Sequence, residues 1–229
     1  YSQRNNLEVF SRFKETKDSD LRNISFLNTS KIASKIYLKP SEIKNKVDHN
    51  SIVYKGNKTK YLVPDLVSNR FIGSRIFFIE GDNYIVGDTF FIAEFKDKSL
   101  KEIYLASLNS TLTFLNVLVT GRKNMGDGVL LFYGPEFNNL EFVIPKKNID
   151  KIKSVYSKIR SREVCEILVE LGFDKNYPIR EQEPNPLSDR KELDNLLFDE
   201  LNLSTEERNE VYWATAELVK ERTDKAASR

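Results

Sequence analysis

The sequence predicts a mixed α/β (α+β) fold, in which a largely antiparallel sheet packs on a central helix and a helical segment ends the chain. Three observations predict it. The N-terminal part holds short runs of β-branched and aromatic residues separated by turn-forming residues. A long stretch with apolar residues at helical spacing follows, and helical patterns return after Pro145. We therefore expect an entry linker or helix over 1–20, an α/β domain over 21–147 and a helical segment over 148–229.

The expected sheet is built from runs of residues with high strand propensity. Turns such as Gly81-Asp82-Asn83 separate consecutive runs. Short turns join neighbouring strands in antiparallel order, so we expect a meander that leads into the central helix. The runs are 51–54, 60–64, 75–80, 84–86 and 89–95.

The central helix is expected to begin at Ser99, because Ser99-Leu100-Lys101-Glu102 has the pattern of a capping box. Apolar residues then recur at spacings of four, four, three and four, which places them on one helical face. These residues are Tyr104, Leu108, Leu112, Leu115 and Val119. Gly121 is expected to end the helix in the left-handed conformation that favours glycine.

A cationic, glycine-rich turn from Gly121 to Gly128 follows the central helix. Strands are expected over 129–133 and 142–144, and Pro145 ends the second because proline cannot donate to a ladder. Apolar residues then recur at helical spacing over 149–159, and Gly172 ends a further short helix. A second capping box, Ser204-Thr205-Glu206-Glu207, opens the last helix of a C-terminal hairpin.

Three motifs follow one another in the middle of the chain. They are Leu108-Asn109-Ser110-Thr111-Leu112, then Gly121-Arg122-x-Asn124-x-Gly126-x-Gly128-x-Leu130, then a strand that ends in Ile144-Pro145. A fourth, near the C terminus, is Leu193-Asp194-x-x-Leu197-Phe198-x-x-Leu201-x-Leu203-Ser204-x-Glu206-Glu207-Arg208-x-Glu210-Val211-Tyr212. This order of motifs resembles the target-recognition (C-terminal specificity) domain of type II restriction–modification adenine-N6 DNA methyltransferases. The resemblance covers roughly the last two thirds of the chain.

The resemblance implies a domain that recognises a specific sequence in double-stranded DNA, in a prokaryotic cytoplasm. In that family a methyltransferase domain precedes it and binds S-adenosylmethionine. We expect such a domain upstream of Tyr1, since the chain opens on tyrosine instead of methionine. The parent protein would then be a site-specific DNA adenine-N6 methyltransferase, and this chain would hold no cofactor.

The residues of the chain itself contain no methyltransferase motif. An amino-methyltransferase needs an Asn/Asp-Pro-Pro-aromatic loop that polarises the target amine and stacks on a flipped base. Asn185-Pro186-Leu187-Ser188 lacks the second proline and the aromatic ring. The Gly121–Gly128 turn follows a helix, whereas a cofactor loop follows a strand and opens a helix. We therefore expect no catalytic residue in this chain.

An alternative pattern points to a metal-dependent nuclease. Pro64-Asp65 and Glu94-Phe95-Lys96 fit the PD…ExK arrangement, in which Asp65 and Glu94 would hold Mg²⁺ and Lys96 would orient the attacking water. On the expected strand, Glu94 and Lys96 would share one face. If the chain is not a nuclease, Asp65 is a turn residue, and Glu94 and Lys96 lie at a solvated strand end.

The net charge of +2 hides an asymmetry. Residues 31–75 hold ten basic and three acidic side chains, whereas residues 181–210 hold three basic and ten acidic ones. This favours a basic part that approaches a polyanion and an acidic part that stays away from it, unless both runs are only solvated faces. The acidic hairpin could alternatively bind another subunit.

One cysteine, Cys165, and one histidine are too few for a structural zinc site, and no apolar run has the ~18 residues of a membrane helix.

DNA-binding residues are expected where Lys, Arg and Asn lie in turns. Lysine and arginine bind phosphates, and forked side chains read base edges, with arginine suited to guanine and asparagine to adenine. The candidates are Lys55, Lys58, Lys60, Arg70, Arg75, Arg122, Lys123 and Asn124. Each has the alternative of an ordinary surface charge, and Arg122 that of bracing the carbonyls at the end of the helix.

Overall fold

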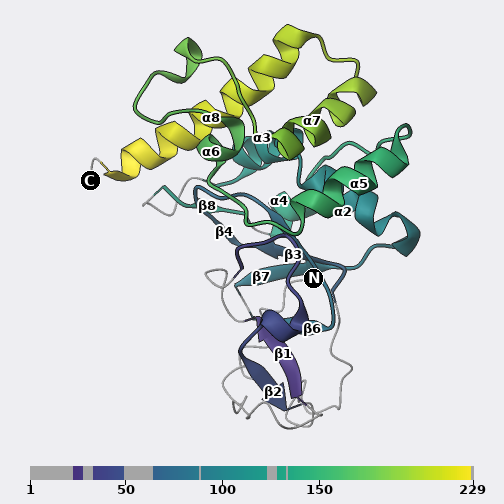
Figure 1. The fold of residues 1–229 in the computed structure, drawn as a ribbon. Helices are drawn as coiled ribbons and strands as arrows, with labels where there is room; N and C mark the ends of the chain where they lie inside the picture. Colours follow the sequence, from purple (N-terminus) through teal and green to yellow (C-terminus); the bar gives the residue numbers. More distant parts are fainter. Residues whose placement is uncertain are drawn as a thin grey trace. The chain divides into compact units, whose positions relative to one another are not determined.

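The computed structural model describes residues 23–27, 33–48, 64–87, 89–122, 128–132 and 134–227. They form a mixed α/β fold, as the sequence predicts (Figure 1). The chain divides by its internal contacts into two units. Unit 1 comprises residues 1–70 and 78–96, and unit 2 comprises residues 71–77 and 97–229. The expected boundary between residues 147 and 148 falls inside unit 2.

Unit 1 contains two small sheets. In the first, β1 (Asn23–Leu27) pairs antiparallel with β2 (Lys46–Asp48) and parallel with β6 (Tyr84–Val86). In the second, β3 (Leu66–Asn69) lies between β5 (Phe78–Glu80) and β7 (Phe90–Ala93), and both pairs are antiparallel. The pairing is therefore largely antiparallel, as expected.

The second sheet of unit 1 has its core at the middle of β3. Val67 lies opposite Ile79 on one side and Ile92 on the other, and all three side chains are buried. Gly81 follows β5 where the chain passes Pro64, and a Cβ there would lie 1.9 Å from the Pro64 carbonyl oxygen. Only glycine admits this approach. The expected strand over 84–86 is confirmed, whereas 51–54 and most of 60–64 lie outside the described residues.

The expected central helix of unit 2 is two helices. α2 (Lys101–Leu108) and α3 (Thr111–Thr120) meet at an angle of 72°. The single-helix prediction is wrong because Ser110 adopts an extended conformation and its hydroxyl caps the Thr113 amide, which starts a new helix. The expected cap at Ser99 is also wrong, since the Asp97 carboxylate accepts the Ser99 N–H at 2.9 Å instead.

The segment after α3 departs from the expected pattern. Gly121 has φ −66° and ψ 146°, so it is extended and not left-handed. The strand expected over 129–133 is limited to β8 (Leu130–Leu131), which pairs with β4 (Phe71–Ile72). A short helix, α4 (Gly134–Asn138), follows it. No ladder forms at 142–144, so the strand expected there is wrong.

The helical C-terminal part of unit 2 follows the sequence patterns closely. Its helices are α5 (Ile149–Ile159), α6 (Ile167–Leu171), α7 (Ser188–Glu200) and α8 (Thr205–Ala227). The second capping box is confirmed: the Ser204 amide donates to Glu207 at 2.7 Å, and the Glu207 amide donates to the Ser204 hydroxyl at 3.3 Å. Gly172 ends α6 with φ 75°, as expected.

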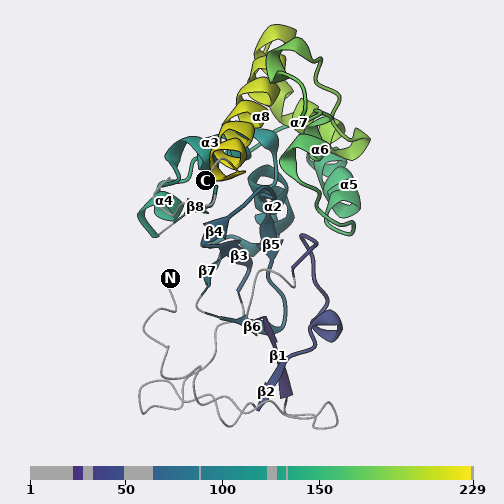
Figure 2. The same cartoon turned by 90° about the vertical axis from the view of Figure 1, so that its left-hand side faces the viewer.

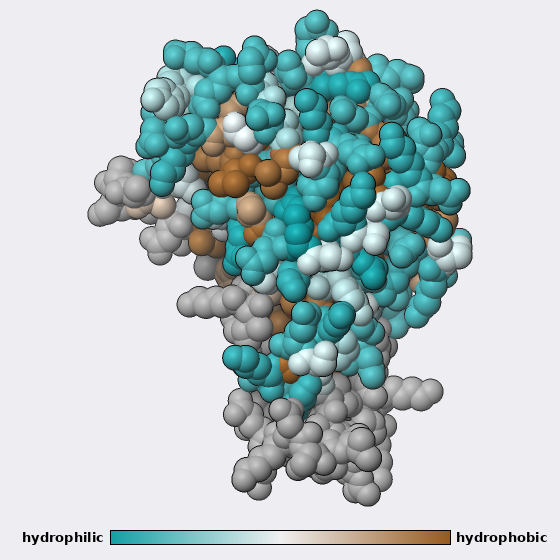
Figure 3. Space-filling model, in the orientation of Figure 1, coloured by the Kyte–Doolittle hydropathy of each residue, from teal (hydrophilic) through white to brown (hydrophobic). Residues whose placement is uncertain are grey.

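The core of unit 2 forms where these helices cross. α3 packs on α8, and α5 packs on α2 and α7 (Figure 2). α5 buries Ile152, Val155, Tyr156 and Ile159, which are the residues that its periodicity selects. On the face seen in Figure 3, the described surface is mostly hydrophilic and hydrophobic residues show between the helices.

Among the described residues, no single helix is long and apolar enough to cross a membrane. The residues from Lys98 to Thr120 reach that length and composition only as a bent pair of helices.

Candidate nucleic-acid interface

The two-stranded ribbon of unit 2 joins two of the segments that the sequence marks for DNA binding. Phe71 lies opposite Leu131, and Ile72 lies opposite Leu130. On the other side of Leu131, Arg122 exchanges two backbone hydrogen bonds with it, both 3.0 Å long. The residues before Arg75 and the start of the glycine-rich turn therefore belong to one small β element.

A buried arginine from α8 fixes the turn that follows β4. The guanidinium of Arg222 donates to the carbonyl oxygens of Ile72 and Gly73, each at 2.8 Å. Arg222 is only 9% exposed, and burial lowers its pKa to about 10. It stays protonated at neutral pH, so both hydrogen bonds are charge-assisted and stronger than bonds between neutral groups.

The next residue of the turn is held from α6. The Ser74 carbonyl accepts the Ile167 N–H at 2.9 Å, and the Ser74 hydroxyl donates to Glu166 at 2.9 Å. Arg75 follows directly and is partly exposed. In the part of the chain that the structure describes, the Arg75 side chain makes no ion pair. A rigid backbone therefore presents an available guanidinium.

The glycine-rich turn is anchored at both ends. At its start, a Cβ on Gly121 would lie 2.8 Å from the Val117 carbonyl oxygen of α3. At its end, Gly128 has φ 68°, and a Cβ would lie 2.9 Å from the Arg222 carbonyl oxygen. α8 therefore contacts both loops through the same residue. Lys123 and Asn124, between these ends, lie outside the described residues.

Arg122 has a partner that its sequence context does not predict. Its Nε donates to the Glu136 carboxylate of α4 at 2.5 Å, and its side chain remains 47% exposed. The structure thus shows an ion pair to α4 where the sequence alternative was a brace on the helix-end carbonyls. An exposed pair of this kind contributes little stability, about 0–1 kcal/mol, so its main effect is to orient the guanidinium.

Of the remaining candidate positions, the structure describes Arg70. Arg70 belongs to unit 1, where its amide donates to the Thr89 carbonyl at 3.1 Å and its guanidinium carbon lies 5.6 Å from the Phe91 ring centroid. Arg70 and Arg75 therefore belong to different units. Lys55, Lys58 and Lys60 lie outside the described residues.

The nuclease pattern lies in unit 1. Asp65 is buried, and its Oδ2 accepts the Phe95 N–H at 3.0 Å, which is a structural role. β7 ends at Ala93, so the prediction that Glu94 and Lys96 share a strand face is wrong. Within the described ranges, no group of three His, Cys, Asp or Glu side chains is placed to hold a metal ion.

Two of the motifs that carry the family resemblance meet at the start of α3. Asp194 of α7 accepts the Thr111 amide at 2.9 Å and the Thr111 hydroxyl at 2.6 Å. Arg190, one turn earlier, donates to the Asn109 carbonyl. Burial raises the pKa of Asp194, while Arg190 and the Thr111 donors act in the opposite direction. Asn109, Thr111 and Asp194 of these motifs therefore have a structural role in unit 2.

A buried ion network connects this junction to α6. Glu170 is fully buried and accepts two hydrogen bonds from Arg162, at 2.7 and 2.8 Å, and one from Arg190 at 3.3 Å. Burial alone would raise the pKa of Glu170, but the bonds from Arg162 and the charge of Arg190 lower it. Arg162 also binds Asp189 at 2.6 Å. Glu170 on α6 and Arg190 on α7 are charges among buried apolar helix positions, which is the sequence signal for this network.

The acidic run 181–210 is partly neutralised within unit 2. Arg180 binds both Glu210 and Glu217 of α8, and Arg208 binds Asp199 at 2.7 Å. Lys158 of α5 lies 3.5 Å from Glu192. The acidic residues of the hairpin therefore connect helices, in addition to giving the surface its charge.

The geometry of unit 2 thus combines a fixed turn, an oriented arginine on a short ribbon and a buried scaffold. Comparison of the chain with protein-family models, with curated proteins and with solved structures found no match in any of the three. Any function must therefore be argued from the residues themselves.

Proposed function

We propose that this chain is the target-recognition part of an adenine-N6 DNA methyltransferase of a restriction–modification system. It binds duplex DNA and selects the site, while a separate upstream domain binds S-adenosylmethionine and transfers the methyl group. The observation that carries this proposal is the clamp of Arg222 on the Ile72 and Gly73 carbonyls. It holds rigid the turn from which Arg75 projects.

A rigid turn matters because base reading depends on geometry. An arginine distinguishes guanine by two parallel hydrogen bonds to O6 and N7, and both form only when the guanidinium plane is fixed. The backbone before Arg75 is held by α8 and by α6, so little conformational freedom is left to lose on binding. We therefore assign base reading to Arg75.

The other basic candidates have a different role in this proposal. Lys55, Lys58, Lys60 and Lys123 supply phosphate contacts, which give affinity without sequence preference. Arg122 is oriented by Glu136 on the same ribbon as the turn of Arg75, so it is placed to contact the backbone or a neighbouring base. Arg70 and Asn124 remain candidate base readers from the sequence pattern alone.

The test begins with a random-sequence duplex library from which the whole chain selects its preferred site. Fluorescence anisotropy then compares the selected duplex with random duplex. Arg75→Ala should weaken binding to the selected duplex by about 1–3 kcal/mol and should change binding to random duplex little. Lys58→Ala should weaken both alike and reduce the slope of log affinity against log salt by about one.

Lys191→Ala is the matched control for a lost surface cation. Lys191 is exposed on α7, which lies away from β4 and β8 in both views of the molecule (Figures 1 and 2). This variant should bind both duplexes like the wild type. If no sequence is enriched from the library, or if Arg75→Ala loses specific and non-specific affinity in equal proportion, the recognition role of the turn is wrong.

A further inference from the structure

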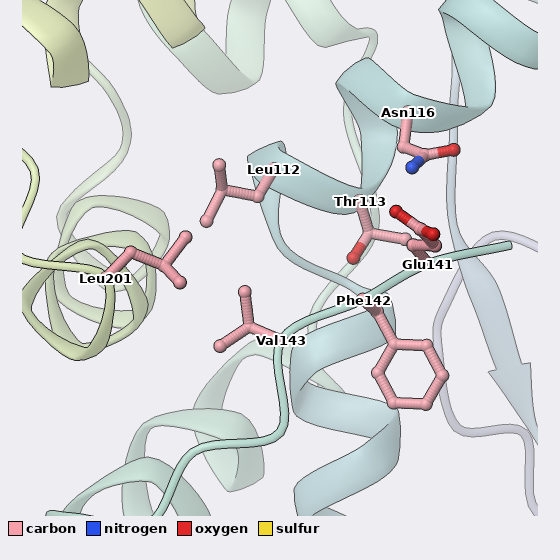
Figure 4. A pocket seen from close by; sticks show the side chains of 7 residues that line it. All are labelled: Leu112, Thr113, Asn116, Glu141, Phe142, Val143 and Leu201. Atoms are coloured by element: carbon pink, nitrogen blue, oxygen red, sulfur yellow. The ribbon is translucent and has the colours of Figure 1, made fainter.

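A hollow of about 330 Å³ opens on the surface of unit 2 beside α3 (Figure 4). At one end, the side chains of Leu112 from α3, Val143 and Leu201 point toward one another. At the other end, Asn116 of α3 and Glu141 lie side by side. The hollow is therefore apolar at one end and polar at the other.

The helix that forms one wall is apolar on both sides. α3 buries Phe114, Val117 and Leu118 against the rest of unit 2. Its opposite side carries Leu112, Leu115 and Val119 at helical spacing, and Val119 is 66% exposed. A helix that is hydrophobic all round is normally covered all round.

This surface continues beyond the helix. Leu201, which follows α7, is 46% exposed, and Val143 is partly exposed between it and α3. We call Leu112, Leu115, Val119, Val143 and Leu201 the α3 face. An apolar surface with a hollow and a polar rim is typical of a protein-binding site.

The negative charge at the rim of the hollow indicates which kind of partner covers the α3 face. Among the described residues, Glu141 is the only charged one that lines the hollow, and it makes no ion pair with them. The carboxamide oxygen of Asn116 beside it is buried and has no hydrogen-bond donor in the described part of the chain. A partner that supplies an ammonium or guanidinium group would pair with the Glu141 carboxylate, and a further N–H or O–H donor would satisfy the Asn116 oxygen.

Two other occupants fit this chemistry less well. Duplex DNA is a polyanion, and Glu141 would repel its phosphates. A second copy of the chain, packed about a two-fold axis, would bring another Glu141 carboxylate to the same apolar interface. A different polypeptide with a basic residue among apolar ones fits better.

We propose that the α3 face is the docking site for an amphipathic helix of another protein segment. The apolar side of that helix covers Leu112, Val143 and Leu201, and a lysine or arginine lies opposite Glu141. Docking of this kind is the helix-in-groove mode, in which the apolar anchors of the docked helix recur three, four and seven residues apart. The residues that line the hollow do not include those of β4, β8 or Arg122, so the docking proposal can be tested independently of the DNA-binding proposal.

The test is a displayed library of helical peptides, selected on the whole 229-residue chain and counter-selected on Leu201→Glu. The recovered sequences should share apolar residues at helical spacing and one lysine or arginine. They should bind the wild type at least about tenfold more tightly than Leu201→Glu, because a central apolar anchor dominates such interfaces. On Glu141→Lys, selection should instead recover peptides with aspartate or glutamate at that position.

Val169→Glu is the matched control, because Val169 is 52% exposed and lies on α6, outside the hollow. The selected peptides should bind it like the wild type, and circular dichroism should show all three variants folded. The proposal is overturned if the peptides bind Leu201→Glu equally well or lack the basic residue. It is also overturned if sedimentation shows a dimer that Leu201→Glu abolishes, or if duplex DNA displaces the peptides.

Discussion

At the scale of single residues, the Arg222 guanidinium is the contact that links the scaffold to the candidate interface. Arg222→Met removes two donors and leaves the carbonyl oxygens of Ile72 and Gly73 without them, which should lower the free energy of unfolding by about 1–3 kcal/mol. The turn before Arg75 then loses its anchor, so affinity for the selected duplex should fall although Arg222 itself is buried. Urea denaturation and fluorescence anisotropy measure the two effects.

Lys225→Met is the control for this variant, since Lys225 lies one turn further along α8 and its pair with Glu221 is long, at 3.9 Å, and exposed. Stability and DNA affinity should both stay near the wild-type values. If Arg222→Met keeps full affinity for the selected duplex, the turn does not need this anchor. The sequence holds no local signal for the role of Arg222, because its partners lie about 150 residues earlier in the chain.

At the scale of elements, the sequence predicts best what depends on near neighbours. The periodicity of α5 and the capping box of α8 are confirmed because each is decided within one or two turns of helix. The break between α2 and α3 is missed because apolar spacing continues across Asn109-Ser110, although both residue types favour helix caps. The start of α3 is also held by α7, through Asp194 and Arg190, and no local pattern shows these contacts.

The network that holds these elements together predicts a pH dependence. Glu170→Gln removes the buried carboxylate that Arg162 and Arg190 share, which should lower the free energy of unfolding by about 3–5 kcal/mol at neutral pH. The pKa of Glu170 is lowered in the folded chain. Its stabilising effect is therefore present above the unfolded pKa of about 4.3 and is lost as the pH falls through the folded value. Urea denaturation should show the gap between wild type and variant shrinking below about pH 4.

Glu163→Gln provides the comparison, because Glu163 is exposed beside Arg162 and its side chain makes no ion pair among the described residues. Its stability should follow the wild type across the same pH range. A gap between wild type and Glu170→Gln that stays constant from pH 3 to neutral would show that the Glu170 charge is not what stabilises the network.

At the scale of the whole molecule, two assays test for the catalytic activities considered from the sequence, metal-dependent DNA cleavage and methyl transfer. We expect no Mg²⁺-dependent nicking of plasmid DNA and no methyl transfer from labelled S-adenosylmethionine by this chain. Asp65 caps the Phe95 amide, and Glu94 and Lys96 lie beyond the end of β7. Nicking that Asp65→Ala or Glu94→Ala abolishes would instead establish the nuclease alternative.

The assay is informative only if those variants are folded, so their circular dichroism should match that of the wild type. Asp65→Asn is the gentler variant, because its carboxamide oxygen can still accept the Phe95 N–H.

The division of the chain into units has no counterpart in the sequence pattern. Residues 71–77 belong to unit 2, where β4 pairs with β8, and only long-range contacts decide that pairing.

The contact between Arg222 and the turn after β4 also sets an order of events during synthesis. Arg222 lies 150 residues after Ile72, so it emerges from the ribosome long after Ile72 and Gly73. The turn cannot form its hydrogen bonds to Arg222 until then. Contacts of such long range form late, because closing the long intervening loop has a large cost in conformational entropy. In the nascent protein, the turn before Arg75 is therefore completed only when α8 docks. A partly made chain without α8 therefore lacks this anchor of the turn.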